Sequence, residues 1–148
     1  MLSTQSQGHV TLRSTDPREP PVIFSNFLAH KTDEQTLVNG IKLARRLSQA
    51  PSLAHVTEEE AIPGPQVKSE KEILEYVRAN ASSFYHPVGT CKMGNDDLSV
   101  VDNQLRVHRV ECLRVIDASI MPTIIRGHAN APTIMIAEKG ADLIAHHV

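Results

Sequence analysis

Residues 83–94 have the sequence SFYHPVGTCKMG, in which a histidine stands directly before a proline. The ring of Pro87 excludes His86 from the helical region of backbone conformations and favours an extended one. Val88-Gly89-Thr90 then predicts a tight turn, so the backbone would present the imidazole at a fixed angle. An imidazole changes charge near neutral pH and is the side chain most often used for general acid–base catalysis. The pattern therefore indicates a candidate base, with a solvated loop histidine as the alternative.

A second stretch that could carry chemistry is RGHANAPT, at 126–133. Gly127 permits an unusual turn, His128 follows it, and Pro132 suits the first turn of a helix. Free N–H groups at a helix start attract negative charge, so His128 and Asn130 could hold an anion or a polar ligand there. The alternative is that Asn130 merely caps the helix and that His128 is a solvated loop residue.

The four side chains of His86, Cys91, His108 and Cys112 offer two nitrogens and two sulfurs, a set that zinc accepts. Their spacings are His-x4-Cys and His-x3-Cys, without the Cys-x-x-Cys knuckle that usually marks a closed zinc site. We therefore expect no metal site. With only these two cysteines we expect no disulfide framework either.

The elements that must position these residues follow from periodicity and helix caps. Alternation in HVTLRS (9–14) predicts a strand, and 22–28 a short extended piece. Thr32 with Gln35, and Ser69 with Glu72, match capping boxes and predict helices that end near 49–52 and near Asn80. Residues 55–68 predict an exposed loop, and 100–117 predict two β segments about a tight connection.

A last helix is predicted from Pro132, with one core-facing apolar side. We expect that side to contain Ile134, Ala137, Ala141 and Ile144. Gly140 inside the helix indicates close packing against a neighbouring element. The order of strand, helix, loop, helix, hairpin and helix predicts an α+β fold, with an antiparallel sheet and flanking helices.

Composition limits the class of protein. The 148 residues suit one domain, 1–148, and a hydrophobic content of 41% suffices for a core. A net charge of −2 with mixed charges predicts no nucleic-acid partner. No apolar run approaches the roughly 20 residues of a membrane span. The start, MLSTQSQGHV, does not have the pattern of a signal peptide, so the default expectation is a cytoplasmic protein.

Four stretches, in order, resemble the C-terminal signature of the glucose–methanol–choline (GMC) oxidoreductases, which are FAD-dependent alcohol oxidases and dehydrogenases. They are HPVGTCKMG (86–94), VVDNQLRV (100–107), LRVIDASIMP (113–122) and GHANAPTIMIAEKGADLI (127–144). Residues 8–28 are similar to the family strand that enters the substrate domain. The resemblance implies a substrate-binding domain plus a strand and helix that return to a flavin domain. The flavin-binding G-x-G-x-x-G motif is absent from this chain, so we expect no tight FAD binding by the chain alone.

The resemblance also implies roles for individual residues. His86 matches the family histidine that acts as base on the substrate hydroxyl, and His128 matches the position that hydrogen-bonds the alcohol oxygen. Asp117 and Ala118 match a position near the FAD ribityl and pyrophosphate groups. The residues implied at the flavin itself are His128, Ala129, Asn130, Pro132 and Thr133. The expected partners are a small alcohol, and either a flavin-domain chain or a second copy of this chain.

One departure from the family pattern lies in the 107–113 stretch. Where V-x-G-V-x-G-L is expected, Arg109 and Cys112 replace both glycines. If the turn needs a positive φ, Arg109 stores strain of order 1–3 kcal/mol. This departure keeps a second function open, in which the chain is a catalytically silent module that binds or assembles with a separate flavin-domain chain.

Overall fold

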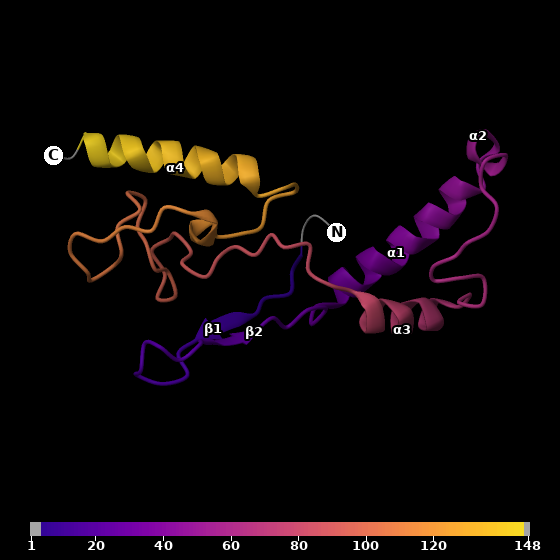
Figure 1. Ribbon diagram of the computed structural model, residues 1–148, viewed down its shortest axis with the longest axis horizontal. Coiled ribbons are helices and arrows are strands. Elements are labelled where there is room, and N and C mark those ends of the chain that lie inside the picture. Colours follow the sequence, from indigo (N-terminus) through magenta and orange to yellow (C-terminus); the bar gives the residue numbers. More distant parts are fainter. Residues whose placement is uncertain (1–3, 147–148) are drawn as a thin grey trace. The chain divides into compact units, whose positions relative to one another are not determined.

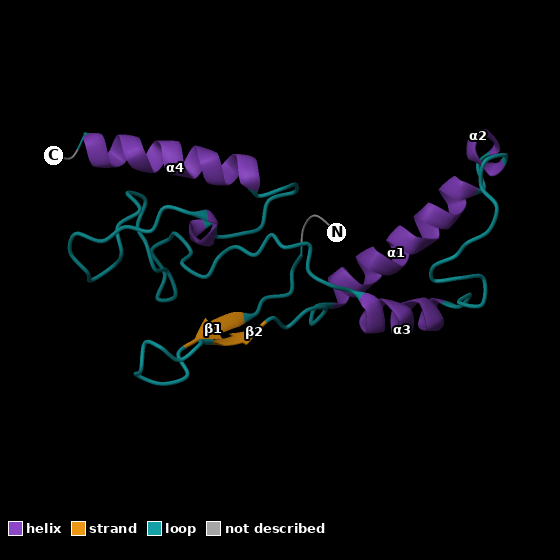
Figure 2. Cartoon of the chain, in the orientation of Figure 1, coloured by secondary structure: helices purple, strands orange, loops and turns teal. Residues whose placement is uncertain are grey.

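A computed structural model of the chain describes residues 4–146 (Figure 1). In chain order the elements are β1 (His9–Thr11), β2 (Val22–Phe24), α1 (Lys31–Ser48), α2 (Pro51–Ala54), α3 (Glu70–Asn80), the 3-10 helix η1 (Ala118–Ile120) and α4 (Asn130–Ala145). The strands β1 and β2 pair as a two-stranded antiparallel sheet, and long loops join the helices (Figure 2). The predicted α+β class is confirmed, with a sheet smaller than expected.

The chain divides into two compact units, one of residues 4–8 and 23–82 and the other of residues 9–22 and 83–146. In the first unit α1 packs against α3 around the buried side chains of Val38, Ile73 and Val77. An ion pair between Arg78 and Glu34, at 2.6 Å, also connects these two helices. This helical unit supports none of the predicted site residues.

The starts of the helices test the predicted caps. The capping box of α3 is confirmed, because the N–H of Glu72 donates to Ser69 Oγ at 3.2 Å and Glu72 Oε2 accepts from the N–H of Ser69 at 2.7 Å. The box predicted at Thr32 is wrong. The N-cap of α1 is His30, whose Nδ1 accepts from the N–H of Thr32 at 3.2 Å. An imidazole nitrogen here replaces the hydroxyl that the pattern suggested.

Asp33 in α1 is the one buried charged side chain among the described residues, with 1% of its surface exposed. Its carboxylate accepts from the N–H of Gln5 at 2.9 Å and from the N–H of Ser6 at 2.8 Å, and also from Ser6 Oγ. Burial alone would raise the pKa of this carboxyl, but these hydrogen bonds outweigh burial and lower the pKa. Asp33 therefore fixes residues 5–6 against the helix.

The core of the second unit consists of buried aliphatic side chains from its loops, η1 and α4. They are Val101, Leu105, Ile120, Met121 and Ile136. The two β segments predicted within 100–117 are wrong, because only isolated bridges such as Arg106–Arg114 occur there. Leu105, Arg109 and Cys112 have φ values of 63°, 62° and 58°. Such left-handed residues interrupt an extended run, so the segment folds as consecutive turns.

The buried face of α4 differs from the predicted one. Ile134 and Ile144 are 55% and 47% exposed, whereas Ile136 and Gly140 are buried. Because α4 has apolar residues around much of its circumference, spacing alone could not select its core face. The predicted close packing of Gly140 is confirmed, since an added Cβ would collide with the side chain of Ile116.

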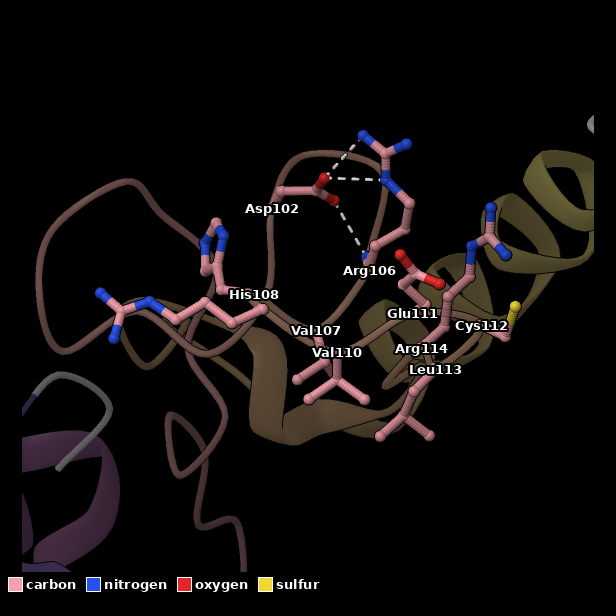
Figure 3. A pocket seen from close by; sticks show the side chains of 10 residues that line it. Asp102, Arg106, Val107, His108, Val110, Glu111, Cys112, Leu113 and Arg114 are labelled. Carbon is pink, nitrogen blue, oxygen red and sulfur yellow. Dashed lines mark hydrogen bonds and ion pairs between the residues drawn. The ribbon is translucent and has the colours of Figure 1, made fainter.

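A pocket of about 480 Å³ lies in the turn-rich segment and is lined by Asp102 and residues 106–114 (Figure 3). Figure 3 shows Asp102 paired with Arg106 on one side of it, and their side chains lie 2.8 Å apart. Neither His86 nor His128 lines this pocket. It therefore does not mark the predicted site.

No helix within residues 4–146 combines the length and the hydropathy needed to cross a bilayer.

We expect Asp33→Ala to lower the free energy of unfolding by about 1–3 kcal/mol, because the donors on residues 5–6 lose their buried acceptor. Since the folded pKa is lowered, the stabilisation is complete above the usual aspartate value of about 3.9 and is lost as the pH falls through the folded value. Urea unfolding over a pH series measures both effects. Asp97→Ala, at an exposed carboxylate, is the control, and equal losses for the two variants would contradict the assignment.

The left-handed residues of the 107–113 turn give a second expectation. A left-handed conformation costs a non-glycine residue about 1–2 kcal/mol, and glycine removes that cost. Glycine also raises the entropy of the unfolded chain, which lowers stability by about 0.4–1 kcal/mol. Arg109→Gly and Cys112→Gly should therefore each stabilise the chain by about 0.5–1 kcal/mol net. Thermal or urea unfolding measures the gain. Glu111→Gly is the matched control. Glu111 is not left-handed, so glycine at this position should lower the stability of the chain. A loss of stability in both test variants would show that their side chains matter more than the strain.

Candidate active site

The loop that carries His86 is held by its own glycine and by the core. Gly89 has a φ of 89°, a conformation that side chains rarely adopt, and a Cβ there would lie 3.4 Å from the carbonyl oxygen of Met121. Val88 packs against the core cluster of the second unit. The chain after His86 thus lies against the core, and its turn is at Thr90 and Cys91, later than the predicted one at Val88-Gly89-Thr90.

Two backbone hydrogen bonds connect the end of this loop to η1. The N–H of Cys91 donates to the carbonyl of Ser119 at 3.0 Å, and the N–H of Met93 donates to the carbonyl of Ile120 at 2.8 Å. From η1 the chain runs through residues 121–127 to His128 at the start of α4. The two predicted stretches therefore meet, although they are far apart in the sequence.

The side chains of His86 and His128 are in direct contact. Nε2 of His86 lies 2.9 Å from Nδ1 of His128, across 42 residues of chain. The ring centroids are 5.0 Å apart and the ring planes meet at 77°. His86 is half-buried and His128 is exposed. The structure thus brings together the two residues that the sequence singled out as a base and its helper.

The distance between the two nitrogens has a chemical consequence. A hydrogen bond between imidazoles needs a hydrogen on one nitrogen and a lone pair on the other. The pair therefore combines an N–H donor with a basic nitrogen at one place, which is what the removal of a hydroxyl proton needs. His128 is exposed as the alternative interpretation expects, and its ring is also hydrogen-bonded to His86.

Phe84 is a third member of this cluster that the sequence analysis missed. Its ring centroid lies 6.3 Å from that of His86 and 6.2 Å from that of His128. A compositional signal was present, because the chain has only three Phe and two Tyr, and Phe84 and Tyr85 directly precede His86. The site is therefore a group of three rings.

The residues predicted near a cofactor lie on η1 and α4 or directly before them, and these two helices pack against each other. Asp117 is the N-cap of η1, where Oδ1 accepts from the N–H of Ser119 at 2.7 Å. Its second carboxylate oxygen has no hydrogen bond in the described part of the chain. Ala118 is half-buried against the core. Asp117 thus shapes the turn and keeps one acceptor available.

The N-terminus of α4 has unsatisfied donors. Ala129 is its N-cap and supplies no side-chain hydrogen bond, so the interpretation of Asn130 as a helix cap is wrong. Thr133 Oγ1 donates to the carbonyl of Ala129 at 2.7 Å, and Pro132 has no N–H. Within residues 4–146 the N–H groups of Asn130 and Ala131 have no acceptor. This helix end is therefore open to a negatively charged group.

The four side chains that were weighed as zinc ligands are not grouped together. Within the described range 4–146, no three His, Cys, Asp or Glu side chains are grouped closely enough to hold a metal ion. His86 is engaged with His128, and Nε2 of His108 lies 3.0 Å from the carbonyl oxygen of Gly94. Both cysteines are free thiols.

Asp96 stabilises the loop that follows. Its carboxylate accepts from Lys92 Nζ at 2.8 Å, from the N–H of Leu98 at 2.9 Å and from Ser99 Oγ at 3.0 Å. The hydrogen bond from Lys92, with the two others, lowers the pKa of this carboxyl to about 2. The 92–99 loop is thus fixed next to the backbone bonds that connect it to η1.

Comparison with known proteins relates this architecture to a family. The family model described as GMC oxidoreductase matches residues 4–137. The alcohol dehydrogenase (acceptor) of Pseudomonas putida is 46% identical over 147 residues, which cover 99% of this chain and 27% of that protein. The oxygen-dependent choline dehydrogenase of Escherichia coli O157:H7 is 45% identical over 97% of this chain and 25% of its own length. The chain thus spans about a quarter of these curated relatives.

A solved structure extends the similarity to the fold. The FAD-dependent oxidoreductase from Chaetomium thermophilum superposes with a TM-score of 0.91 at 30% identity, over 99% of this chain and 26% of that one. Because the family model matches most of the chain and the solved structure has the same fold, this chain belongs to the GMC oxidoreductase family and corresponds to its C-terminal portion.

Proposed function

We propose that this chain forms the C-terminal part of an FAD-dependent enzyme that oxidises the CH–OH group of a small alcohol, with His86 as the base and His128 as its helper. The observation that carries the proposal is the 2.9 Å contact between His86 Nε2 and His128 Nδ1. An alcohol becomes a good hydride donor only as its O–H proton is withdrawn. A positioned imidazole contributes typically about 10²–10⁴-fold to such a step.

The residues at η1 and α4 fit an FAD group. The unpaired N–H groups of Asn130 and Ala131, at the positive end of α4, suit an electron-rich edge of a flavin. The free carboxylate oxygen of Asp117 suits a hydroxyl donor such as a ribityl group. The chemistry that FAD supplies when bound is acceptance of a hydride. These residues would hold the cofactor, and the histidines would handle the proton.

The 2.9 Å separation also specifies how the alcohol would enter. An oxygen in line between the two nitrogens needs two hydrogen bonds of about 2.8 Å each, so the histidine pair must separate. The alcohol then donates its hydroxyl proton to Nε2 of His86 and accepts a hydrogen bond from Nδ1 of His128. The O–H bond would break with its proton going to Nε2 of His86, which becomes an imidazolium, and the carbinol carbon would give up its hydride to FAD as the carbonyl forms.

A chimeric enzyme tests these roles. When this chain replaces the matching segment of the Pseudomonas putida alcohol dehydrogenase, we expect His86→Ala to lower kcat by about 10²–10⁴ while FAD stays bound. His128→Asn should be milder, because an amide can still donate a hydrogen bond to the alcohol oxygen. Steady-state kinetics with one alcohol, repeated with the carbinol carbon deuterated, measures the effect.

The exposed His55 in the first unit is the matched control, and His55→Ala should leave kcat unchanged. If His128→Asn abolished turnover and His86→Ala kept it, base and helper would be reversed. If neither variant changed the rate beyond about threefold, which is under ~1 kcal/mol, both histidines would be structural.

A second candidate function is a catalytically silent binding or assembly module. The observation that favours it is the pair of strained positions, Arg109 and Cys112, where the family pattern has glycine. Under this function the wild-type chimera would bind FAD and still fail to turn over.

We also expect the chain by itself to bind FAD only weakly, because its 148 residues contain no G-x-G-x-x-G turn to hold the pyrophosphate. Fluorescence titration of the purified chain with FAD measures the dissociation constant. FMN, which lacks the adenylate, is the control ligand. A nanomolar dissociation constant for FAD would overturn this expectation and require another pyrophosphate site in the chain.

A further inference from the structure

We propose that Phe84 is a positioning residue, whose ring holds the imidazoles of His86 and His128 in the rotamers that direct Nε2 and Nδ1 toward each other. The inference rests on the proposed function for its catalytic meaning. The geometry that carries it concerns only the three rings.

Phe84 contacts both members of the pair almost equally. The centroid distances of 6.3 Å and 6.2 Å fall within the 4.5–7 Å range over which aromatic rings interact. The rings are tilted by 39° and 47°, so Phe84 stacks flat on neither imidazole. The phenyl ring therefore closes a triangle whose third side is the 5.0 Å between the histidines.

The backbone before His86 brings Phe84 into this position. Tyr85 is left-handed, with a φ of 59°, a conformation that is unfavourable for a bulky residue. Ser83 Oγ accepts a hydrogen bond from the N–H of Tyr85 at 3.0 Å and closes a local turn. The bend at Tyr85 thus lies between two side chains, Phe84 and His86, whose rings are in contact.

The histidine pair needs such support. His128 is exposed, and one hydrogen bond does not restrict both side chains to a single rotamer. Phe84 is itself 78% exposed, so it contributes little to the core of its unit. Exposed apolar residues occur singly on most proteins and need no explanation. The argument rests instead on the contact of Phe84 with both imidazoles.

Nuclear magnetic resonance of the isotope-labelled chain tests the proposal without catalysis. In the wild type we expect cross-peaks between the ring protons of Phe84 and of both histidines, and couplings typical of one χ1 rotamer in each histidine. Phe84→Ala should average the rotamers of both histidines and remove the cross-peak between their rings. Phe84→Tyr should restore it, because the ring is kept. Phe27→Ala, at a 60% exposed phenylalanine of the first unit, is the control.

The amide spectrum of each variant shows whether the fold is intact. If Phe84→Ala kept the cross-peak and the single rotamers in a folded chain, the proposal would be wrong. If the amide spectrum showed that Phe84→Ala does not fold, Phe84→Leu would replace it, because leucine keeps the apolar volume but not the ring. Averaged histidine rotamers in Phe84→Leu would support the proposal, and single rotamers would contradict it. In the chimera, Phe84→Ala should lower kcat more than it raises KM. If the proposed function were wrong, the His86→Ala chimera would stay active. That result would leave the nuclear magnetic resonance spectra of the Phe84 variants unchanged, so the two failures can be told apart.

Discussion

Two backbone hydrogen bonds, from Cys91 to Ser119 and from Met93 to Ile120, are the constraint on which the site depends. They join two stretches of irregular chain that no continuous strand holds together. On one side lies the loop with His86, and on the other lies η1, which leads to His128. The side chains of Ile120 and Met121 complete the connection, because both are buried in the core that Val88 also contacts. The 2.9 Å contact between the histidines follows from this junction.

The second unit achieves this with little regular structure, and left-handed residues explain why. Leu105, Arg109 and Cys112 each turn the chain where an extended run would have continued. The segment consequently folds as turns around Val101, whose side chain is fully buried. Strain at non-glycine positions must be supported by surrounding packing. Here the side chain of Leu105 is buried in the core, whereas those of Arg109 and Cys112 are exposed.

The sequence predicted those features that depend on local chemistry. The capping box of Ser69 and Glu72, the Pro132 turn and the close packing of Gly140 were all visible in short patterns. The positive φ at Arg109 could be anticipated once its position was compared with a glycine of the family pattern. Tertiary features were harder to predict. The buried face of α4 was misassigned because the helix is apolar on several sides. Phe84 was missed because its contact with His128 spans 44 residues, from 84 to 128.

The surroundings of the two histidines differ in a way that bears on the proposed chemistry. Three constraints follow His86 in the chain: a proline, the left-handed Gly89 near Met121, and the backbone hydrogen bonds to η1. The main chain is therefore fixed over several residues after His86. His128 follows Gly127, where an added Cβ would have only the side chain of Ile125 within 4 Å, and its own ring is exposed. An alcohol that enters between the two nitrogens must displace one ring. Under the proposed function, His128, as the exposed ring, would leave the position in which Phe84 holds it, and His86 would keep its orientation.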